Sequence, residues 1–575
     1  MQENRFLQPS FPFHWLFIPL LVYFTAFLGT HPLVTPDEGR YPDVARHMLL
    51  SGDWVVPYLN GTVFFHKPIL YYWLETLSMH VFGINAWAIR LPGALTGFFG
   101  CVLVYQASRR LFGEPVARIA TVILATNPLY FVASQFADMN LEVGVLIASA
   151  VLCFFVAEAG KTSRTFFWRM LAWMFMGLAI LAKGLIGIVL PAMVFGLWVL
   201  LFNQWRRLPA FCFVRGILLL LAIVAPWFFL MEQREPGFLH YFIVVQHFER
   251  YSGTNFNNVQ PFWFYPAVLL LGFMPWMTDV VGIVKRLPLT RQFADTVLQQ
   301  PAGGRMVWML LIWIVAMVCF FSMPASKVMG YILPVMPAVA LLIACDLQNG
   351  KSFPLHSKIF FAVFLLLTWA YVVSQVIKAD DKTLWVLSAA VASTAITFGG
   401  AIFFWRRQRS AFVEAAGVAI MMALFNLSCL IVVPAFTHHN QVVIADIIQS
   451  HWHENDRMVF YEKYYYDIPI YVNTRKPVTV VTNWEAPQLP NQDGWRNELW
   501  FGRDRDPVSR QWLIMPSQLE SVVAAANVTG AGNLFVVADE KDCPVLLEKY
   551  PLKKIAVDGS ACLLVQQAST LAVLQ

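Results

Sequence analysis

Long apolar runs recur along the chain between residues 14 and 436. A transmembrane helix needs roughly 20 mostly apolar residues, and thirteen such stretches can be placed on this sequence. They are residues 14–30, 90–107, 116–134, 141–157, 166–182, 184–203, 214–231, 261–284, 306–323, 329–346, 359–377, 384–404 and 412–434. The runs are continuous, whereas barrel strands alternate polar and apolar residues. The sequence therefore predicts a polytopic α-helical membrane protein with about thirteen transmembrane helices.

The composition excludes other classes of protein. Hydrophobic residues make up 58% of the chain and charged residues 13%, whereas soluble domains have about 25% charged residues. A soluble enzyme, a disulfide scaffold and a disordered chain are therefore excluded. The net charge of +6 comes from short Lys and Arg clusters between apolar runs, which is a topology signal. We expect the lipid bilayer as a partner and no nucleic acid.

The distribution of Lys and Arg predicts the orientation. Six alternate loops hold fifteen of these residues and the intervening loops hold four. Since short cytoplasmic loops are enriched in Lys and Arg, we expect a cytoplasmic N-terminus. An odd number of spans then places residues 437–575 outside, in the periplasm if the membrane is the bacterial inner membrane. Residues 31–90 and 232–260 are predicted to face the same side.

Residue 436 is the predicted boundary between two domains. Residues 1–436 form the transmembrane domain, and residues 437–575 have the composition of a globular α/β domain. Strand-like runs and helix-like patterns alternate there: strands at 458–461, 478–481, 512–515, 533–537 and 562–565, and helices at 517–526 and 544–549. Cys543 and Cys562 would face an oxidising compartment, where they form a disulfide or remain free thiols.

The first exterior segment, residues 31–90, concentrates charged residues. Asp37, Glu38 and Arg40 come directly after the first span, and Lys67 follows further along. Residues 42–50 have an amphipathic pattern, which predicts a helix on the membrane surface. Its polar positions, away from the apolar face, are Asp43, Arg46 and His47. A solvated connector is the alternative interpretation of this segment.

Isolated polar residues also occur at the outward ends of later spans. Ionisable groups at membrane depth are costly and usually face a cavity. The residues concerned are Asp138, Asn140, Glu142, Lys183, His247, Glu249, Arg250 and Lys327. Their concentration at one membrane face predicts a polar cavity there. For Lys183 alone, a tight turn with a snorkelling side chain is the alternative.

Several of these segments together resemble a known family. The segments are Asp37-Glu38-Gly39-Arg40-Tyr41, Lys67-Pro68, Ala182-Lys183-Gly184, Gln246-His247-Phe248-Glu249-Arg250-Tyr251, and Ser326-Lys327 with Tyr331-Ile332-Leu333-Pro334. They are similar to motifs of the bacterial aminoarabinose transferases of lipid A, in the protein mannosyltransferase-like GT-C superfamily. The resemblance covers the whole membrane region in order, and the motifs are specific as a set.

The resemblance implies an inverting glycosyltransferase. The donor would be a sugar linked to a polyprenyl phosphate, and the acceptor lipid A or another envelope molecule on the outer face of the cytoplasmic membrane. The absence of a Gly-rich phosphate loop from the sequence agrees with a lipid-linked donor. A protein or another glycan as acceptor stays open, and so does a transporter or flippase, although the charges collect at one face rather than at the midplane.

The resemblance also implies roles for individual residues. Cations would stabilise the charge that builds on the leaving phosphate: Arg40, Lys67, Lys183, Arg250 and Lys327. Asp37 matches the catalytic carboxylate, which acts as a general base towards a hydroxyl acceptor or orients a phosphate acceptor. Glu38 and Asp138 are secondary catalytic candidates. Further substrate contacts are expected from Tyr41, His66, His247 and Tyr331.

The chain departs from the family at one motif. The aminoarabinose transferases have Glu-Lys-Pro where this chain has His66-Lys67-Pro68, so a carboxylate that could contact an amino sugar or a metal is absent. His66 and His247 are either ligands of a divalent metal or two hydrogen-bonding groups. No other cofactor is expected.

Overall fold

A computed structural model describes most of the chain. The described residues are 16–159, 164–249, 258–279, 302–348, 411–432, 440–489, 494–526 and 532–566, with isolated positions 363, 370, 391 and 399. They fall into two compact units. The membrane unit comprises Met1–Leu28, Gly93–Pro226 and Gln260–Ala435, and the second unit comprises Gly29–Pro92, Trp227–Val259 and Phe436–Gln575.

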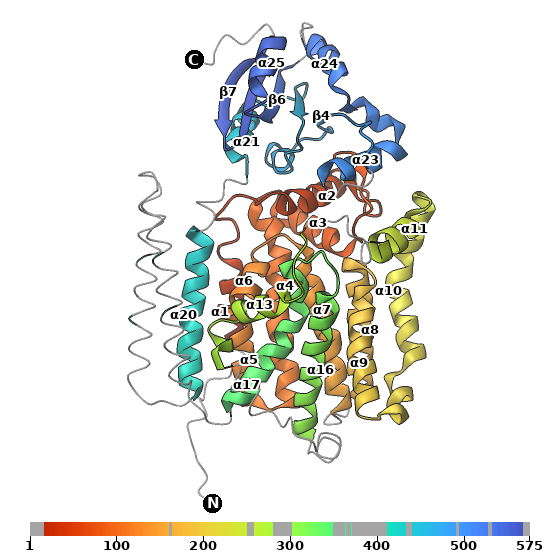
Figure 1. The fold of residues 1–575 in the computed structure, drawn as a ribbon, viewed down its shortest axis with the longest axis vertical. Coiled ribbons are helices and arrows are strands. Elements are labelled where there is room, and N and C mark those ends of the chain that lie inside the picture. The colour runs from red at the N-terminus through yellow and green to blue at the C-terminus, as the bar shows by residue number, and fades with distance from the viewer. Residues whose placement is uncertain are drawn as a thin grey trace, which may run out of the picture. The chain divides into compact units, whose positions relative to one another are not determined.

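The regular elements in the described part of the membrane unit are helices (Figure 1). Helix α7 contacts α8 and α9, and α9 contacts α16. The elements are α1 (Phe17–Thr25), α4 (Ala86–Leu111), α5 (Glu114–Thr126), α6 (Pro128–Ser134), α7 (Met139–Glu158), α8 (Thr165–Lys183), α9 (Ile186–Leu201), η2 (Trp205–Phe211), α10 (Phe213–Arg234), α13 (Phe264–Gly272), η4 (Trp276–Asp279), α16 (Ala302–Ser322), η5 (Met329–Val335), α17 (Met336–Gln348) and α20 (Ala411–Val432). Helices α4 and α10 contribute residues to both units.

Five described helical segments are long and apolar enough to cross a membrane: α4, α7, α8, α10 and η5 with α17. Helices α5 and α6 make a sixth span if they are counted together, although they are bent by 63°. The prediction of a polytopic helical membrane protein is confirmed. The count of thirteen stays a prediction, because residues 359–377 and 384–404 lie outside the described residues apart from isolated positions.

Helix α7 shows how sequence determines packing in the membrane unit. Asp138 caps its N-terminus by accepting a hydrogen bond from the backbone N–H of Asn140 at 3.1 Å, as short polar side chains do at helix starts. Gly144 lets η5 approach closely, since a Cβ there would lie 2.9 Å from that of Leu333. The two elements that carry Asp138 and Tyr331 are therefore packed together.

The second unit combines Gly29–Pro92, Trp227–Val259, which begins within α10, and the terminal region. The first two parts contain α2 (Asp37–Ser51), β1 (Tyr58–Leu59), β2 (Thr62–Val63), α3 (Leu70–Phe82), α11 (Phe238–His240) and η3 (Tyr241–Glu249). The terminal region contains α21 (Val442–His451), β3 (Arg457–Tyr461), α22 (Ile468–Val472), β4 (Thr479–Val481), α23 (Trp495–Arg505), η9 (Pro507–Gln511), β5 (Leu513–Ile514), η10 (Pro516–Gln518), α24 (Leu519–Ala526), β6 (Leu534–Asp539), α25 (Cys543–Lys549), β7 (Lys553–Asp558) and β8 (Ala561–Gln566).

Six strands of the terminal region form a mixed sheet in the order β5-β4-β3-β6-β8-β7. Strands β5, β4, β3 and β6 are parallel neighbours, and β8 pairs antiparallel with β6 and β7. Strands β6 and β8 are almost entirely buried, and their side chains pack with α24 and α25. The predicted α/β character of this region is confirmed, and each of the five predicted strands is present.

Strand β7 was not predicted from the sequence. It begins with Lys553 and Lys554, which are exposed, and it lies at the edge of the sheet. Edge strands often carry Lys because the charge blocks pairing with another chain. The two consecutive lysines of β7 hide the alternation of polar and apolar residues that marks a strand.

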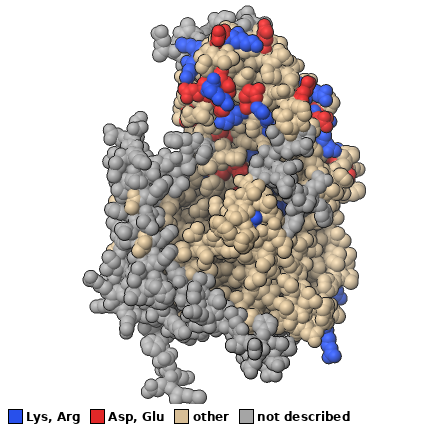
Figure 2. All heavy atoms as spheres, in the orientation of Figure 1, with Lys and Arg blue, Asp and Glu red and all other residues tan. Residues whose placement is uncertain are grey.

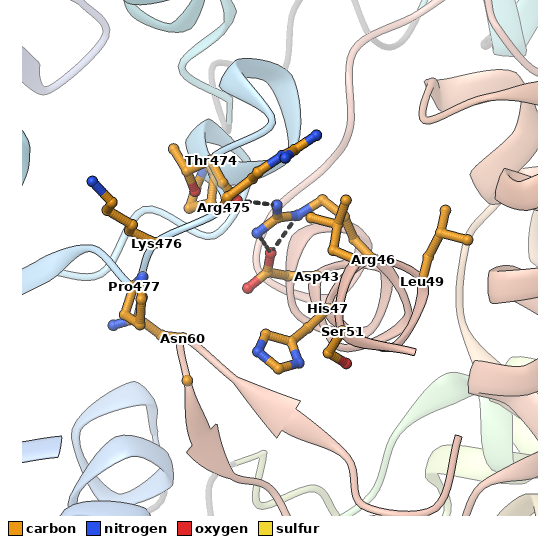
Figure 3. Close-up of a pocket in the computed structure, with 13 residues that line it drawn as sticks. Asp43, Arg46, His47, Leu49, Ser51, Asn60, Thr474, Arg475, Lys476 and Pro477 are labelled. Carbon is orange, nitrogen blue, oxygen red and sulfur yellow. Dashed lines mark hydrogen bonds and ion pairs between the residues drawn. The ribbon is translucent and has the colours of Figure 1, made fainter. Parts of the chain in front are cut away.

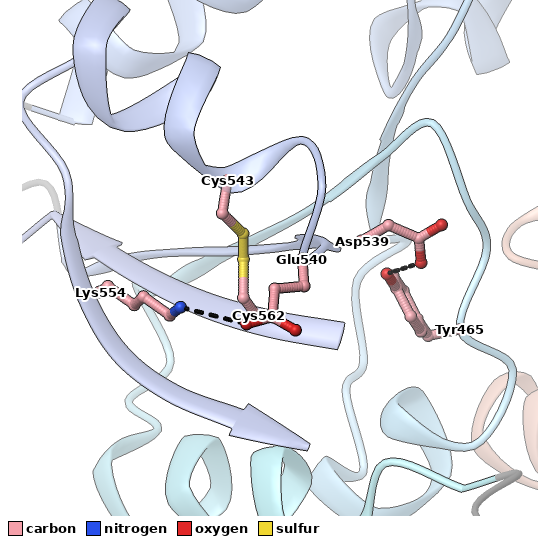
Figure 4. Close-up of a disulfide and its surroundings, with 6 residues drawn as sticks. All are labelled: Tyr465, Asp539, Glu540, Cys543, Lys554 and Cys562. Atoms are coloured by element: carbon pink, nitrogen blue, oxygen red, sulfur yellow. Dashed lines mark hydrogen bonds and ion pairs between the residues drawn. A yellow bond between two sulfur atoms is a disulfide. The ribbon is translucent and has the colours of Figure 1, made fainter. Parts of the chain in front are cut away.

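Cys543 and Cys562 form a disulfide, with their Cα atoms 6.7 Å apart. The bond joins the start of α25 to β8 (Figure 4). Of the two alternatives that the sequence left open, the structure has the disulfide. It links the sheet to the helix that covers it, within the buried core of the terminal region.

Charged side chains are unevenly distributed on the face that Figure 2 shows. Lys, Arg, Asp and Glu gather over the terminal region, and the described surface over the membrane helices is nearly uncharged. This is the pattern expected for one region in water and another in lipid.

Candidate functional site

The start of α2 carries a cluster of ionised side chains. Asp37 is the first residue of the helix, and Arg40 lies one turn later on the same face. The Arg40 guanidinium donates to Asp37 Oδ1 and to Glu498 Oε1 of α23. Tyr466 also donates its hydroxyl to Glu498, at 2.7 Å. One arginine is thus held between a carboxylate of the first exterior segment and one of the terminal region.

The surroundings of Arg40 keep it charged. Burial alone lowers the pKa of a guanidinium, but the neighbouring Tyr41, Glu498, Tyr466 and Asp37 raise the pKa of Arg40 well above its ordinary value. Burial, followed by the Glu498 carboxylate, raises the pKa of Tyr466, so this phenol remains a neutral donor. Arg40 is therefore positioned as a fixed cation next to Asp37.

Gly39 accounts for the close approach of α2 to the terminal region. A Cβ at this position would lie 2.5 Å from the Cβ of Tyr466. This distance is too short for any residue with a side chain. The glycine between Glu38 and Arg40 therefore lets Arg40 reach Glu498. Asp37 has a side chain that is 49% exposed, so its carboxylate remains accessible to a substrate.

Glu38 has a different role from its neighbour Asp37. Its carboxylate is fully buried and accepts hydrogen bonds from Arg90 Nε and Nη2, both at 2.7 Å. It also accepts from the backbone N–H of Val34, while Arg90 donates to the carbonyls of His31 and Pro32. This pair fixes the segment that leads into α2. The geometry favours Asp37 over Glu38 as the group that meets a substrate.

The second half of α2 differs from the sequence interpretation. The helix begins at Asp37 rather than at residue 42, and Asp43 and Arg46 are buried instead of lying on a solvated face. Arg46 donates to Asp43 through Nε and Nη2, at 2.9 and 2.6 Å, and to the carbonyl of Thr474. Burial is tolerated because each charge has an opposite partner.

The remaining candidates of the first exterior segment lie near α2. The Tyr41 ring is 5.0 Å from the Arg40 guanidinium carbon, and Tyr41 is buried against Tyr71 and Tyr72. His66 stacks on Phe64 with ring centroids 4.8 Å apart, and its ring centroid is 6.1 Å from that of Tyr241. Lys67, next to His66, is half-buried.

The membrane unit holds a second group of candidates. Lys183, the last residue of α8, donates to Asn140 Oδ1, and its ammonium lies 4.2 Å from the ring centroid of Tyr331. Asn140 in turn donates to Asp138. The structure therefore brings together Asp138, Lys183 and Tyr331, with Asn140 as the link between the two charges.

Lys327 contacts the backbone of a neighbouring segment. It is buried, and its ammonium donates to the backbone carbonyl of Gln260 at 2.7 Å. Tyr265 donates to the carbonyl of the adjacent Val328 at 3.2 Å. These bonds tie the segment before η5 to the segment before α13, and a direct role of Lys327 with a substrate stays a prediction.

Two predicted residues cannot be placed. Arg250 lies outside the described residues, and His247 lies in η3 with its side chain also outside them. Among the residues that the structure describes, no group of three or more His, Cys, Asp or Glu side chains could hold a metal ion. The pairing of His66 with His247 as metal ligands stays a prediction.

Sequence reasoning missed Glu498, Tyr466 and Arg90. Glu498 is 458 residues from Arg40, and no local pattern links the two. Arg90 could have been found, because a lone arginine at the start of a long apolar run needs a partner.

The architecture defines the class of the protein. Membrane-crossing helices, a charged cluster at the start of α2 and a terminal mixed sheet make it a multi-pass helical membrane protein. The same fold occurs in ArnT from Cupriavidus metallidurans, solved with bound undecaprenyl phosphate, which is 24% identical and superposes with a TM-score of 0.79 over 98% of this chain and 100% of that chain. The apo structure of that protein gives a TM-score of 0.75 at the same identity, over 96% and 97% of the two chains.

Sequence comparisons agree with the fold. Residues 66–229 match the family model for dolichyl-phosphate-mannose-protein mannosyltransferases. Undecaprenyl phosphate-alpha-4-amino-4-deoxy-L-arabinose arabinosyl transferase 2 of Proteus mirabilis is 30% identical over 325 residues, 55% of this chain and 56% of that protein. The corresponding transferase of Edwardsiella ictaluri is 30% identical over 60% of this chain and 62% of that protein. The resemblance predicted from the motifs is confirmed, with matches that span less than two thirds of these relatives' length.

Proposed function

We propose that this protein is an integral membrane glycosyltransferase that moves 4-amino-4-deoxy-L-arabinose from undecaprenyl phosphate to lipid A. The single observation that carries the proposal is the half-exposed Asp37 carboxylate, fixed by Arg40 at the start of α2. The similarity to named aminoarabinose transferases supports the donor, the sugar and the acceptor. The fold, shared with a protein solved with undecaprenyl phosphate, agrees with a lipid-linked donor.

The reaction is a single displacement at the anomeric carbon, with inversion. An acceptor oxygen attacks, the bond from the sugar to the phosphate oxygen breaks, and undecaprenyl phosphate leaves with the electron pair. If the acceptor is a hydroxyl, Asp37 takes its proton as a general base. If the acceptor is an ionised phosphate of lipid A, no proton is transferred and Asp37 orients the acceptor or holds the cationic amino group of the sugar.

Cations stabilise the leaving phosphate in this mechanism. Lys67 and Lys183 are the described candidates whose ammonium groups best suit the role, because a lysine has three N–H donors. Lys183 is oriented by Asn140 and Tyr331. Arg40 is bound to two carboxylates, which favours a role in positioning Asp37. Arg250 belongs to the same proposed group, on the family resemblance alone.

The proposed location is the bacterial inner membrane. The proposed topology has thirteen spans, a cytoplasmic N-terminus and residues 437–575 in the periplasm. The disulfide Cys543–Cys562 supports the last point, because structural disulfides persist in oxidising compartments. The charge difference between loops supports the orientation.

A transfer assay tests the proposal. The purified protein is incubated with undecaprenyl phosphate-linked aminoarabinose and lipid A, and modified lipid A is detected by mass spectrometry. We expect transfer by the wild type and a loss on the order of 10²-fold or more in Lys67→Ala, the typical effect of removing a donor that stabilises developing charge. Lys541→Ala is the matched control. Lys541 is an exposed lysine of the terminal region, so this variant should keep full activity.

Substitution of the substrates separates the alternatives. If the sugar is transferred to a glycan or protein acceptor while lipid A stays unmodified, the proposed acceptor is wrong but the proposed transferase activity is retained. Movement of the intact donor across vesicles, without transfer to any acceptor, would identify a flippase and refute the proposal.

A further inference from the structure

A cavity of about 330 Å³ lies beside the second half of α2, away from Asp37. One wall is α2, another is the turn between β1 and β2, and the third is the segment that follows α22 (Figure 3). All three walls belong to the second unit. None of the residues proposed for transfer lines this cavity.

The walls of the cavity are fixed by hydrogen bonds. The Asn60 amide pairs with the backbone of Val478, donating to its carbonyl at 3.0 Å and accepting from its N–H at 2.8 Å. Trp512 donates to the carbonyl of Asn60 at 3.0 Å. Arg46 bonds the carbonyl of Thr474 at 2.5 Å, which joins α2 to the segment after α22. These bonds hold the three walls of the cavity together.

The side chains around the cavity leave it positively charged. Arg46 and Asp43 neutralise each other, so the net charge comes from Arg475 and Lys476 at the exposed rim. Lys476 donates one N–H to the carbonyl of Glu454, and a lysine has two more. Among the lining residues, Asp43 is the sole carboxylate.

His47 adds a neutral donor to the cavity. Its Nδ1 atom is buried and has no hydrogen-bond partner among the described residues. Burial lowers the pKa of His47, so the imidazole is uncharged at neutral pH and can donate one N–H to an anion.

We propose that this cavity binds a phosphate monoester carried by a sugar. Arg475 and Lys476 contact the phosphate, and Arg46 and His47 supply donors on the cavity wall. A bare phosphate would fill little of the space, whereas the volume lies at the lower end of the range for small-molecule pockets. Leu49, Leu50 and Pro477 give the apolar contact that a sugar ring would use.

Binding is measured on the full protein in detergent by isothermal titration with glucosamine 1-phosphate. The test variant is Arg475→Ala combined with Lys476→Ala, both exposed and therefore compatible with folding. The matched control is Lys541→Ala combined with Lys553→Ala, which removes two exposed charges from the same region outside the cavity. We expect the test variant to weaken binding by about tenfold or more and the control by less than about twofold.

Inorganic phosphate serves as the second probe. Tighter binding of glucosamine 1-phosphate than of inorganic phosphate is expected, because the sugar adds apolar contact. Equal binding of the two probes would show a site for free phosphate and would overturn the sugar part of the proposal. Equal affinity in the test and control variants, or no binding of either probe to the wild type, would overturn the proposal. No donor or lipid acceptor is present in this titration, so its failure is distinguishable from failure of the transfer reaction.

Discussion

The two clusters of candidate residues are stabilised in different ways. In the second unit, Asp37 and Glu498 hold Arg40, and Glu38 holds Arg90, so each charge has an opposite charge as partner. In the membrane unit, Lys183 is held by the amide of Asn140 and the ring of Tyr331, and Lys327 by a backbone carbonyl. Asn140 also links Lys183 to the carboxylate of Asp138. We infer that the lysines of the membrane unit are oriented by neutral groups, whereas the arginines of α2 and α4 organise carboxylates.

The largest effect on stability is expected at the Glu38–Arg90 pair. Arg90→Ala leaves a buried carboxylate without its counter-ion, which should lower the free energy of unfolding by about 3–5 kcal/mol. The loss is measured by unfolding the purified protein in detergent with heat or denaturant.

The exposed pair Lys554–Glu540 is the matched control for that experiment (Figure 4). Glu540→Ala should change the stability by about 0–1 kcal/mol. A similar small change for Arg90→Ala would show that the buried pair does not fix the entry into α2.

The second prediction concerns Glu498 as a positioning residue. Glu498→Gln keeps the shape of the side chain, but it removes the charge and replaces one of the two acceptor oxygens by an NH2 donor, so Arg40 is held less firmly. We expect kcat for sugar transfer to fall by about tenfold, as a charged hydrogen bond becomes neutral, with KM for the donor unchanged.

Glu462→Gln is the matched control for Glu498→Gln, because Glu462 pairs with Arg496 in the same region on a more exposed surface. It should leave both kinetic constants near wild type. A change in KM without a change in kcat for Glu498→Gln would contradict its role in positioning Asp37.

The smallest effect is expected from His31. Burial and the nearby Arg90 lower the pKa of His31 to about 4 from 6.5. The folded state therefore binds a proton less tightly than the unfolded state, and stability is lost as the pH falls from 6.5 towards 4. Between pH 7.5 and 5.5 we expect His31 to account for a loss of about 1.4 kcal/mol.

The corresponding measurement compares the wild type with His31→Gln at both pH values. The variant lacks the titrating group, so its stability should fall by correspondingly less over this interval. An identical loss in both proteins would assign the pH dependence to other groups.

The sequence predicted the local features of the fold well. Apolar runs marked the helices of the membrane unit, and β6 and β8 were recognised because both faces of these strands are apolar. Helix α2 was placed on a surface because Asp43 and Arg46 are charged, but the two residues neutralise each other and are buried. A pattern of polar and apolar residues does not show that two charged side chains form an ion pair and can therefore be buried together.

The candidate site was predicted in part. Asp37 and Arg40 belong to one helical turn, so their contact follows from the sequence spacing. The contact of Arg40 with Glu498 spans 458 positions, and it depends on the fold of the terminal region. Gly39 gave a signal that was not used, since a glycine inside a helix often marks a close approach.

The central claim is that Asp37, and not Glu38, is the carboxylate that acts on the acceptor. Single-turnover transfer by Asp37→Asn, with donor binding measured in parallel, tests this claim most directly. For a hydroxyl acceptor we predict a rate lower by roughly 10² to 10⁴ with donor affinity nearly unchanged, and for a phosphate acceptor a smaller loss that appears mainly in acceptor affinity. Wild-type rates and affinities for both substrates in Asp37→Asn would contradict the account and move the reactive carboxylate to Glu38 or Asp138.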